Sequence, residues 1–480
     1  MDKEKYLELD VNENPKRIKD WILFAIQHIL AMLVACITVP VLTGLPIGAT
    51  LISAGIGTIC YILFTKKKSP VFLSSSFAYL APMSSALAIG LINDAGGNNY
   101  LALIIGMFLV GLIYVIVGLV IKFAKTDWLN KLLPPIVVAP IIIVIGLSLS
   151  GSAIENLVRT NGSKQSYNLI AIFCGFSALL ATAISAHYSK KFLKLIPFII
   201  GMCTGYVTAL LFTLIGYYGF GSDYFHIINF DPLISIFTTD FGISTFFNYK
   251  TFIPNDPNSF IFLRFEEISK FDWATIGQVC ALFIPVAFVT ICEHIGDHEN
   301  LGNIINRDLL NGEPGMTRTL MGDGVATALS GALCGAANTT YGENVSVIGM
   351  TKIASVNVVL LAAIFSIVIG FFTPFTALLQ TIPACVTGGV SLLLYGFIAS
   401  SGVRMLIDRK IDFKNTKNIF IASVILVAGI GGLTLKFGND SFTIEISKIA
   451  VAMILGIILN IILKDQKPEE KIETASSEAK

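Results

Sequence analysis

The chain has 480 residues, of which 54% are hydrophobic and 14% are charged. Soluble domains carry about 45–50% apolar and about 25% charged residues, so this composition excludes an ordinary soluble domain and indicates a membrane protein. The formal net charge is +1, and no basic cluster suited to nucleic acid occurs, so we expect a lipid bilayer as partner and no nucleic acid.

Apolar runs of roughly 17–25 residues, the length that crosses a bilayer, recur along the whole chain. Residues 1–20 are charged and polar, so we expect a cytoplasmic N-terminal segment and no cleaved signal peptide. Fourteen spans are predicted, at 21–43, 47–65, 72–90, 101–121, 134–151, 167–187, 194–217, 274–297, 317–336, 340–352, 354–373, 378–400, 418–435 and 445–463.

The distribution of basic residues predicts the orientation. If the N-terminus lies inside the cell, only seven of the 33 Lys and Arg fall on the outer face. An odd number of missed spans would destroy this bias, so the positive-inside rule favours fourteen spans with both termini cytoplasmic. We therefore expect a multi-pass protein of the plasma membrane.

Two of the predicted spans are interrupted by matching runs of hydroxyl residues. The segments are 74–79 (Ser-Ser-Ser-Phe-Ala-Tyr) and 338–344 (Asn-Thr-Thr-Tyr-Gly-Glu-Asn). Consecutive Ser and Thr compete with the helix for backbone hydrogen bonds, and Gly342 loosens the chain. Interruptions at corresponding positions of two halves indicate a transporter with its binding site near mid-membrane.

The two halves resemble each other in order. Residues 25–29 (Ala-Ile-Gln-His-Ile) resemble 291–295 (Ile-Cys-Glu-His-Ile), Phe77 matches Tyr341, and 134–151 resembles 383–402. Seven spans per half place the second half in the opposite orientation. The sequence therefore predicts a seven-plus-seven inverted repeat.

Two segments lie outside this pattern. Residues 218–272 form a long external insert, and both a cover over the outer mouth and a simple connector are open interpretations. Residues 464–480 are charged, have no apolar face and are expected to be a disordered cytoplasmic tail.

Ionisable residues within predicted spans are the candidates for function, because they are costly there and face a wet cavity or the protein interior. Glu293 and Asp297 lie four residues apart and share one helix face. Glu343 lies at the second interruption, and His28 lies in the first span. His28 could instead be a buried, hydrogen-bonded histidine, and Asp297 could be a solvated residue at a helix end.

Other polar residues carry weaker signals. Asp323, between two glycines, is interpreted first as a turn or cap, and His294 and His298 as interface or loop residues. The eight cysteines show no disulfide or metal-ligand spacing and are expected to be reduced packing residues. No motif of an enzyme, a metal site or a cofactor site is recognised, so no enzymatic activity, metal or cofactor is expected.

The residue types at the two interruptions suggest the chemistry of a ligand. A broken helix offers free backbone N–H donors beside free carbonyl acceptors. Two carboxylates add strong acceptors and disfavour an anion, and Phe77 and Tyr341 suit the stacking of a flat ring. A neutral planar heterocycle with N–H and C=O groups matches all three features, whereas a cation matches the acids alone.

With these motifs the chain resembles the nucleobase–ascorbate transporter family, also called nucleobase:cation symporter-2, and within it the bacterial uracil permeases. The motifs that carry the resemblance are 27–28 (Gln-His), 75–78 (Ser-Ser-Phe-Ala), 293–297 (Glu-His-Ile-Gly-Asp), 322–324 (Gly-Asp-Gly), 338–345 and 388–396. The resemblance implies an all-α polytopic fold of fourteen segments, with short strands at the breaks of spans 3 and 10.

The resemblance also implies a domain organisation. A core domain would comprise 21–121 and 274–373, that is spans 1–4 and 8–11, and would carry the substrate. A gate domain would comprise 134–217 and 378–463, that is spans 5–7 and 12–14, and would form a homodimer.

By position, Glu293 and Glu343 would accept the two ring N–H groups of uracil. The backbone N–H groups of Phe77 and Gly342 would donate to its carbonyls, while Ala35 and Tyr341 would line the pocket. His28 and Asp297 would support Glu293 in proton coupling. One departure matters: some uracil permeases have His where this chain has Asp297, and purine-selective relatives also have Asp there.

The resemblance favours a secondary active transporter that imports uracil by proton symport, with alternating access between the core and gate domains. Purine relatives usually carry Gln at the position of Glu343, so the Glu of this chain favours uracil, and a xanthine or uric acid symporter of the same family is the alternative. An anion exchanger or channel of the same fold is the alternative of another class. Uracil is neutral at pH 7, so a shared proton on Glu293 and Asp297, with His28 as a second carrier, would supply the driving force.

Overall fold

The fold is seen in a computed structural model, which describes residues 7–89, 99–125, 127–159, 167–190, 193, 196–238, 242–256, 258–269, 273–439 and 442–463. The predicted tail at 464–480 and the first six residues of the predicted 1–20 segment lie outside the described residues.

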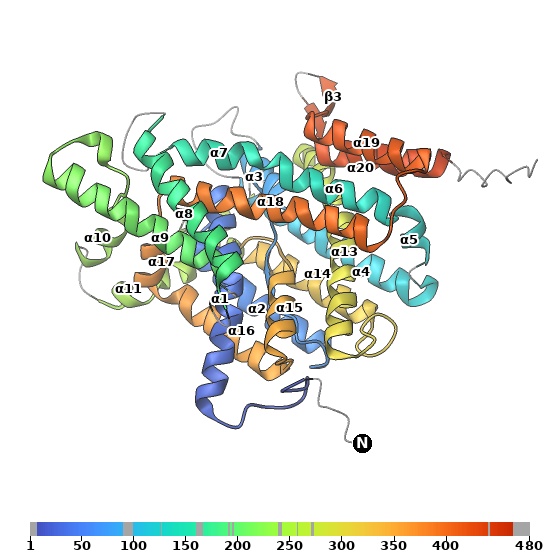
Figure 1. Cartoon of the computed structure of the whole chain (residues 1–480), viewed down its shortest axis with the longest axis horizontal. Coiled ribbons are helices and arrows are strands. Elements are labelled where there is room, and N and C mark those ends of the chain that lie inside the picture. The colour runs from blue at the N-terminus through green and yellow to red at the C-terminus, as the bar shows by residue number, and fades with distance from the viewer. Residues whose placement is uncertain are drawn as a thin grey trace, which may run out of the picture.

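Helices make up most of the described chain (Figure 1). The α-helices of the first half are α1 (Ile18–Thr43), α2 (Ile47–Phe64), α3 (Leu80–Ala88), α4 (Tyr100–Ala124), α5 (Asp127–Leu132), α6 (Pro135–Ser148), α7 (Ser150–Val158), α8 (Leu169–Tyr188) and α9 (Pro197–Phe212). The second half contains α13 (Trp273–Ile305), α14 (Met316–Ala332), α15 (Gly342–Thr351), α16 (Val356–Phe371), α17 (Thr373–Gln380), α18 (Ala384–Asp408), α19 (Thr416–Ile430) and α20 (Lys448–Ile462).

Many of the described helices are long enough to cross a membrane. In the described part of the chain, eight helices are long and apolar enough to span a bilayer, and α16, α19 and α20 are shorter apolar helices. The prediction of a mostly helical, multi-pass membrane protein is therefore confirmed. The count of fourteen spans and the inverted repeat stay predictions.

Both predicted interruptions contain a short strand. β1 (Leu73–Ser75) and β2 (Asn338–Thr340) pair antiparallel, with Leu73 opposite Thr340 and Ser75 opposite Asn338. Each strand leads into a short helix, β1 into α3 and β2 into α15. The implied strands at spans 3 and 10 are thus present, and they join the two halves of the chain.

The helices pack in two groups (Figure 1). In one group α14 packs against α2 and α4, α13 against α4, and α16 against α1 and α2. In the other group α18 packs against α6, α7 and α8, α8 against α9, and α19 against α6 and α20. Glycines allow close approach within each group: a Cβ on Gly111 would lie 2.6 Å from the Gly324 oxygen, and one on Gly389 2.1 Å from the Gly175 oxygen.

The all-α prediction is wrong at one place. β3 (Leu435–Asn439) and β4 (Phe442–Ile446) form an antiparallel pair between α19 and α20, where the predicted spans 418–435 and 445–463 left only a connection. The run Phe-Thr-Ile-Glu-Ile at 442–446 alternates apolar and polar residues, the two-residue period of a strand.

The insert at 218–272 is folded onto the helices. It contains η3 (Asp223–Phe225), α10 (Asp231–Thr238), α11 (Ile243–Phe246), η4 (Tyr249–Phe252), η5 (Ile261–Leu263) and α12 (Phe265–Ser269), and it follows a π-helix, η2 (Thr213–Gly219). The backbone of Phe247 forms a bridge with Phe372, and buried Arg264 lies 4.1 Å from the ring centre of Tyr100. These contacts attach the insert to the ends of α16 and α4.

Candidate functional site

The β1–β2 crossing is the centre of the candidate site. Ser76 continues the ladder, because its N–H donates to the Ala337 oxygen at 2.9 Å. Beyond the strands, α15 begins at Gly342 and α3 at Leu80, and neither helix has a side-chain cap at its N-terminus. The first N–H groups of a helix have no acceptor one turn back within it. The N–H of Leu80 donates to the Phe77 oxygen at 3.2 Å, and that of Asn344 to the Tyr341 oxygen at 3.0 Å. The first N–H of α15, that of Gly342, therefore lies at the crossing.

Residues of the neighbouring helices α2 and α14 form hydrogen bonds with the two strands. The Thr58 hydroxyl donates to the Leu73 oxygen at 3.2 Å and accepts from the Leu73 N–H at 3.0 Å. The Asn338 side-chain amide donates to the Ser53 oxygen at 3.0 Å. The Thr327 hydroxyl donates to the Asn338 oxygen at 2.5 Å. Residues of α2 and α14 therefore satisfy backbone groups that a two-stranded sheet leaves unpaired.

A cavity of about 540 Å³, counting the part open to solvent, lies at this crossing. It is lined by Ser75, Ser76, Phe77, Ala78, Ile142, Ile145, Val289, Glu293, Thr339, Thr340, Tyr341, Gly342, Glu343 and Ile398. Most of these residues belong to the crossing or to α13, whereas Ile142 and Ile145 come from α6 and Ile398 from α18. The cavity thus lies between the two groups of helices.

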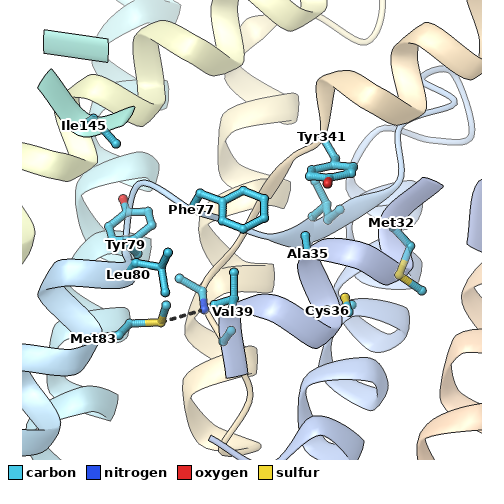
Figure 2. Packing of buried hydrophobic residues seen from close by; sticks show 14 of the residues in the cluster. Met32, Ala35, Cys36, Val39, Phe77, Tyr79, Leu80, Met83, Ile145 and Tyr341 are labelled. Carbon is cyan, nitrogen blue, oxygen red and sulfur yellow. Dashed lines mark hydrogen bonds between the residues drawn. The ribbon is translucent and has the colours of Figure 1, made fainter. Parts of the chain in front are cut away.

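Five of the six residues predicted to bind substrate line this cavity: Glu293, Glu343, Phe77, Gly342 and Tyr341. The side chains of Glu293 and Glu343 are exposed within the otherwise buried surroundings. Ala35, the sixth, is fully buried and does not line the cavity. Figure 2 shows it on α1, on the side of the crossing where Phe77 and Tyr341 lie.

Asp297 lies one helical turn beyond Glu293 and contacts the β1–β2 crossing without lining the cavity. Its Oδ2 accepts a 2.9 Å hydrogen bond from the hydroxyl of Thr340, which itself lines the cavity. A Cβ on Gly342 would lie 3.3 Å from the Oδ1 of Asp297. The carboxylate of Asp297 is therefore packed against the start of α15 and is linked to the cavity through one hydroxyl.

His28 is buried, and its Nδ1 lies 2.7 Å from the Oδ1 of Asn344. This contact joins α1 to the first turn of α15, one residue after Glu343. The predicted support of Glu293 by His28 stays a prediction.

The interpretation of His294, His298 and Asp323 from the sequence is wrong. All three side chains are fully buried, the histidines inside α13 and Asp323 inside α14. For His298 the predicted span ended one residue too early, at 297, whereas α13 continues to Ile305. For Asp323 the two flanking glycines suggested a turn, whereas α14 continues through both of them.

Several residues that line the cavity are not among the predicted binding residues. Ser75, Ser76, Thr339 and Thr340 were recognised as helix breakers but not as cavity residues, although consecutive hydroxyls were the available signal. Ile142, Ile145 and Ile398 lie in uniformly apolar runs, which carry no such signal.

The cavity has the electrostatics of an acceptor site. Its lining includes two carboxylates, four hydroxyl side chains of Ser and Thr, and no Lys or Arg among the described residues. Such a lining favours N–H donors, protons or cations and disfavours anions. In the described part of the chain no group of three His, Cys, Asp or Glu is placed to hold a metal ion.

The sequence matches known proteins over nearly its whole length. The profile of the family described as "Permease family" matches residues 19–437. The uracil permease of Bacillus caldolyticus is 39% identical over 98% of this chain and 98% of its own. The uracil permease of Bacillus subtilis (strain 168) is 38% identical over 97% and 98%. The uracil permease of Escherichia coli (strain K12) is 32% identical over 97% and 96%.

Solved structures with the same fold are more distant in sequence. The transmembrane domain of the cyanobacterial bicarbonate transporter BicA aligns with a TM-score of 0.59 at 14% identity, over 94% of this chain and 99% of its own. The structure of SLC26A9 aligns with a TM-score of 0.60 at 10% identity, over 93% of this chain and 66% of its own. At these identities the likeness concerns the fold alone.

Proposed function

The chain belongs to the permease family of nucleobase:cation symporters, and is a transporter rather than an enzyme; on that premise we propose that it imports uracil across the cell membrane by proton symport.

The observation that carries this proposal is the meeting of Glu293 and Glu343 in one cavity with Phe77 and Tyr341. Uracil is flat and neutral, with two ring N–H donors and two carbonyl acceptors. In the proposed complex the two carboxylates accept from the ring N–H groups, while the N–H groups of Phe77 and Gly342 donate to the carbonyls. The aromatic side chains and Ala35 enclose the ring.

The coupling ion in this proposal is a proton. Glu293 and Asp297 lie on one face of α13, and two carboxylates in a site of low dielectric do not ionise together easily. We assign one exchangeable proton to this pair, with His28 as a second carrier. Transport of one proton across 100 mV releases about 2.3 kcal/mol, enough for roughly fortyfold accumulation of a neutral substrate.

Alternating access follows in the proposal from motion between two domains. The core domain comprises 21–121 and 274–373, and the gate domain comprises 134–217 and 378–463, as expected for fourteen spans in an inverted repeat. The position of the cavity between the two helix groups supports this division. The half-exposed ion pair between Glu299 of α13 and Arg409 beyond α18 is a contact between the two groups. We propose that the gate domains form a homodimer and that both termini face the cytoplasm.

Competition for uptake tests the substrate. Cells or proteoliposomes that contain the protein take up labelled uracil in the presence of unlabelled uracil, 5-fluorouracil, thymine, xanthine, uric acid or bicarbonate. We expect competition by uracil and 5-fluorouracil. Competition by xanthine or uric acid without competition by 5-fluorouracil or thymine would assign a purine symporter. Absence of uracil uptake together with uptake of labelled bicarbonate would assign an anion exchanger of the fold that BicA and SLC26A9 share.

A further inference from the structure

Helix α13 has a second polar face that the proposed site does not use. Each of the two acids that face the β1–β2 crossing is followed directly by a histidine: Glu293 by His294, and Asp297 by His298. Successive residues of an α-helix point about 100° apart, since a turn has 3.6 residues. The two histidines therefore form their own stripe, beside the acids and directed into the packed helices, where both are fully buried.

The first histidine is paired with a buried acid. Nδ1 of His294 lies 2.7 Å from Oδ2 of Asp323 on α14, and neither side chain is exposed. Nδ1–H of the ring donates to the carboxylate in this arrangement. The edge of the Tyr114 ring from α4 meets the same imidazole, with the ring centres 6.3 Å apart.

The second histidine continues the contact to another helix. Nδ1 of His298 lies 2.8 Å from the backbone oxygen of His294, so this nitrogen donates to the carbonyl. Its Nε2 then accepts from the Tyr61 hydroxyl of α2 at 2.6 Å. The hydroxyl of Tyr61 also lies 2.9 Å from Oγ of Ser69, and the two imidazole rings stack at 4.1 Å.

The network of buried polar side chains contributes little to the stability of the helix packing. Within the described part of the chain, Nε2 of His294 is buried without a hydrogen-bond partner, whereas the Asp323 carboxylate also has a backbone hydrogen bond from Thr340. Buried polar atoms without partners are costly, and apolar residues of the same volume are often as stable as a buried ion pair or more so. What such a pair supplies in the best-attested cases is a unique register or orientation.

The positions of Glu293 and Asp297 depend on the rotation of α13 about its own axis. The other packing contacts of this helix come from apolar residues, among them Val286, Ala287 and Ile291, whose contacts are non-directional and tolerate rotation. The His294–Asp323 and His298–Tyr61 hydrogen bonds are directional and come from two different helices, α14 and α2. A rotation of α13 by one residue position would break both bonds and turn Glu293 out of the cavity.

We propose that His294, His298, Asp323 and Tyr61 are positioning residues that fix the rotation of α13 and so aim Glu293 at the cavity and Asp297 at the hydroxyl of Thr340. The functional consequence rests on the proposed function, because it assumes that Glu293 binds the substrate. The structural part does not, since the rotation of a helix can be measured without a substrate.

The test replaces the His294–Asp323 pair with apolar residues of similar size, in the double variant His294→Phe and Asp323→Leu. Its thermal unfolding midpoint should equal or exceed that of the unchanged protein, because the buried pair is removed as a unit. Its affinity for uracil should nevertheless fall by about tenfold or more. The matched control is Ser366→Ala, which removes a buried hydrogen bond between α16 and the Leu51 oxygen of α2, away from α13.

The rotation is read by thiol labelling. In a chain without its eight native cysteines, Glu293→Cys places a thiol at the cavity, and a water-soluble maleimide measures its exposure. The apolar double variant should slow labelling at position 293 by about threefold or more, as expected when a helix turns a residue out of water. The Ser366→Ala control should leave the labelling rate unchanged.

The exchanged pair, His294→Asp with Asp323→His, keeps the hydrogen bond in reverse, and should restore both labelling and affinity relative to the apolar variant. Two results together would overturn the proposal. The apolar double variant would bind uracil like the unchanged protein, and the double substitution would leave the labelling rate of the Glu293→Cys chain unchanged. If labelling slows while the unchanged protein fails to bind uracil, the positioning role holds and the proposed substrate is wrong.

Discussion

The hydroxyl of Thr340 donates a 2.9 Å hydrogen bond to Oδ2 of Asp297. Thr340 is the last residue of β2 and lines the cavity, whereas Asp297 does not line it. The carboxylate of Asp297 is thereby joined to the strand that precedes Tyr341, which lines the cavity. In the proposed mechanism this bond lets occupancy of the cavity affect the protonation of Asp297.

Asp297→Asn tests the coupling. The variant should bind uracil in detergent with nearly unchanged affinity, because Asp297 does not line the cavity. In proteoliposomes it should lose accumulation driven by a pH gradient, because Asn cannot carry a proton. Accumulation of uracil by this variant under an imposed pH gradient without sodium would show that Glu293 and His28 suffice.

The hydroxyl of Thr340 should matter by itself. Thr340→Val keeps the shape of the side chain but removes the donor to Asp297, and a hydrogen bond to a charged group contributes about 1.5–3 kcal/mol. We expect pH-driven accumulation to fall by about tenfold. Thr340→Ser retains the hydroxyl and serves as the control, so equal losses in both variants would contradict a role for the hydrogen bond.

Glu343→Gln should weaken uracil binding by roughly ten- to hundredfold while the protein stays folded. Gln offers one neutral acceptor where Glu offers a charged one, and the difference corresponds to about 1.5–3 kcal/mol. Isothermal titration of the purified variant measures the affinity, and its thermal unfolding midpoint serves as the folding control. Unchanged affinity would remove Glu343 from the binding site.

Close packing of α18 against α8 gives a stability prediction. A Cβ on Gly389 would lie 2.1 Å from the Gly175 oxygen, so Gly389→Ala should destabilise the protein by about 1–3 kcal/mol through overpacking. Gly396→Ala, on the same helix, meets nothing within 4 Å and should be tolerated. The thermal unfolding midpoints of the two variants provide the comparison. Equal midpoints would show that the two helices can separate without cost.

Local features of the chain were predictable from the sequence. Apolar run lengths predicted the long apolar helices, and consecutive hydroxyl residues predicted both places where a helix is interrupted, whereas the strands at these places were implied by the resemblance. Glu293 and Glu343 could be selected because a carboxylate in an apolar run is costly and needs a reason. Each of these inferences depends on residues close together in the chain, which is the range over which propensity and periodicity act.

Only the tertiary structure decided which distant residues meet. Thr339 pairs with Ser74, His28 with Asn344, and His294 with Asp323, and nothing in the local sequence of either partner specifies the other. The same holds for Ile142 and Ile398, which are indistinguishable in sequence from apolar neighbours that face elsewhere. The physical reason is that these partners are chosen by how whole helices pack, and uniformly apolar spans carry no period that would indicate which face is turned inward.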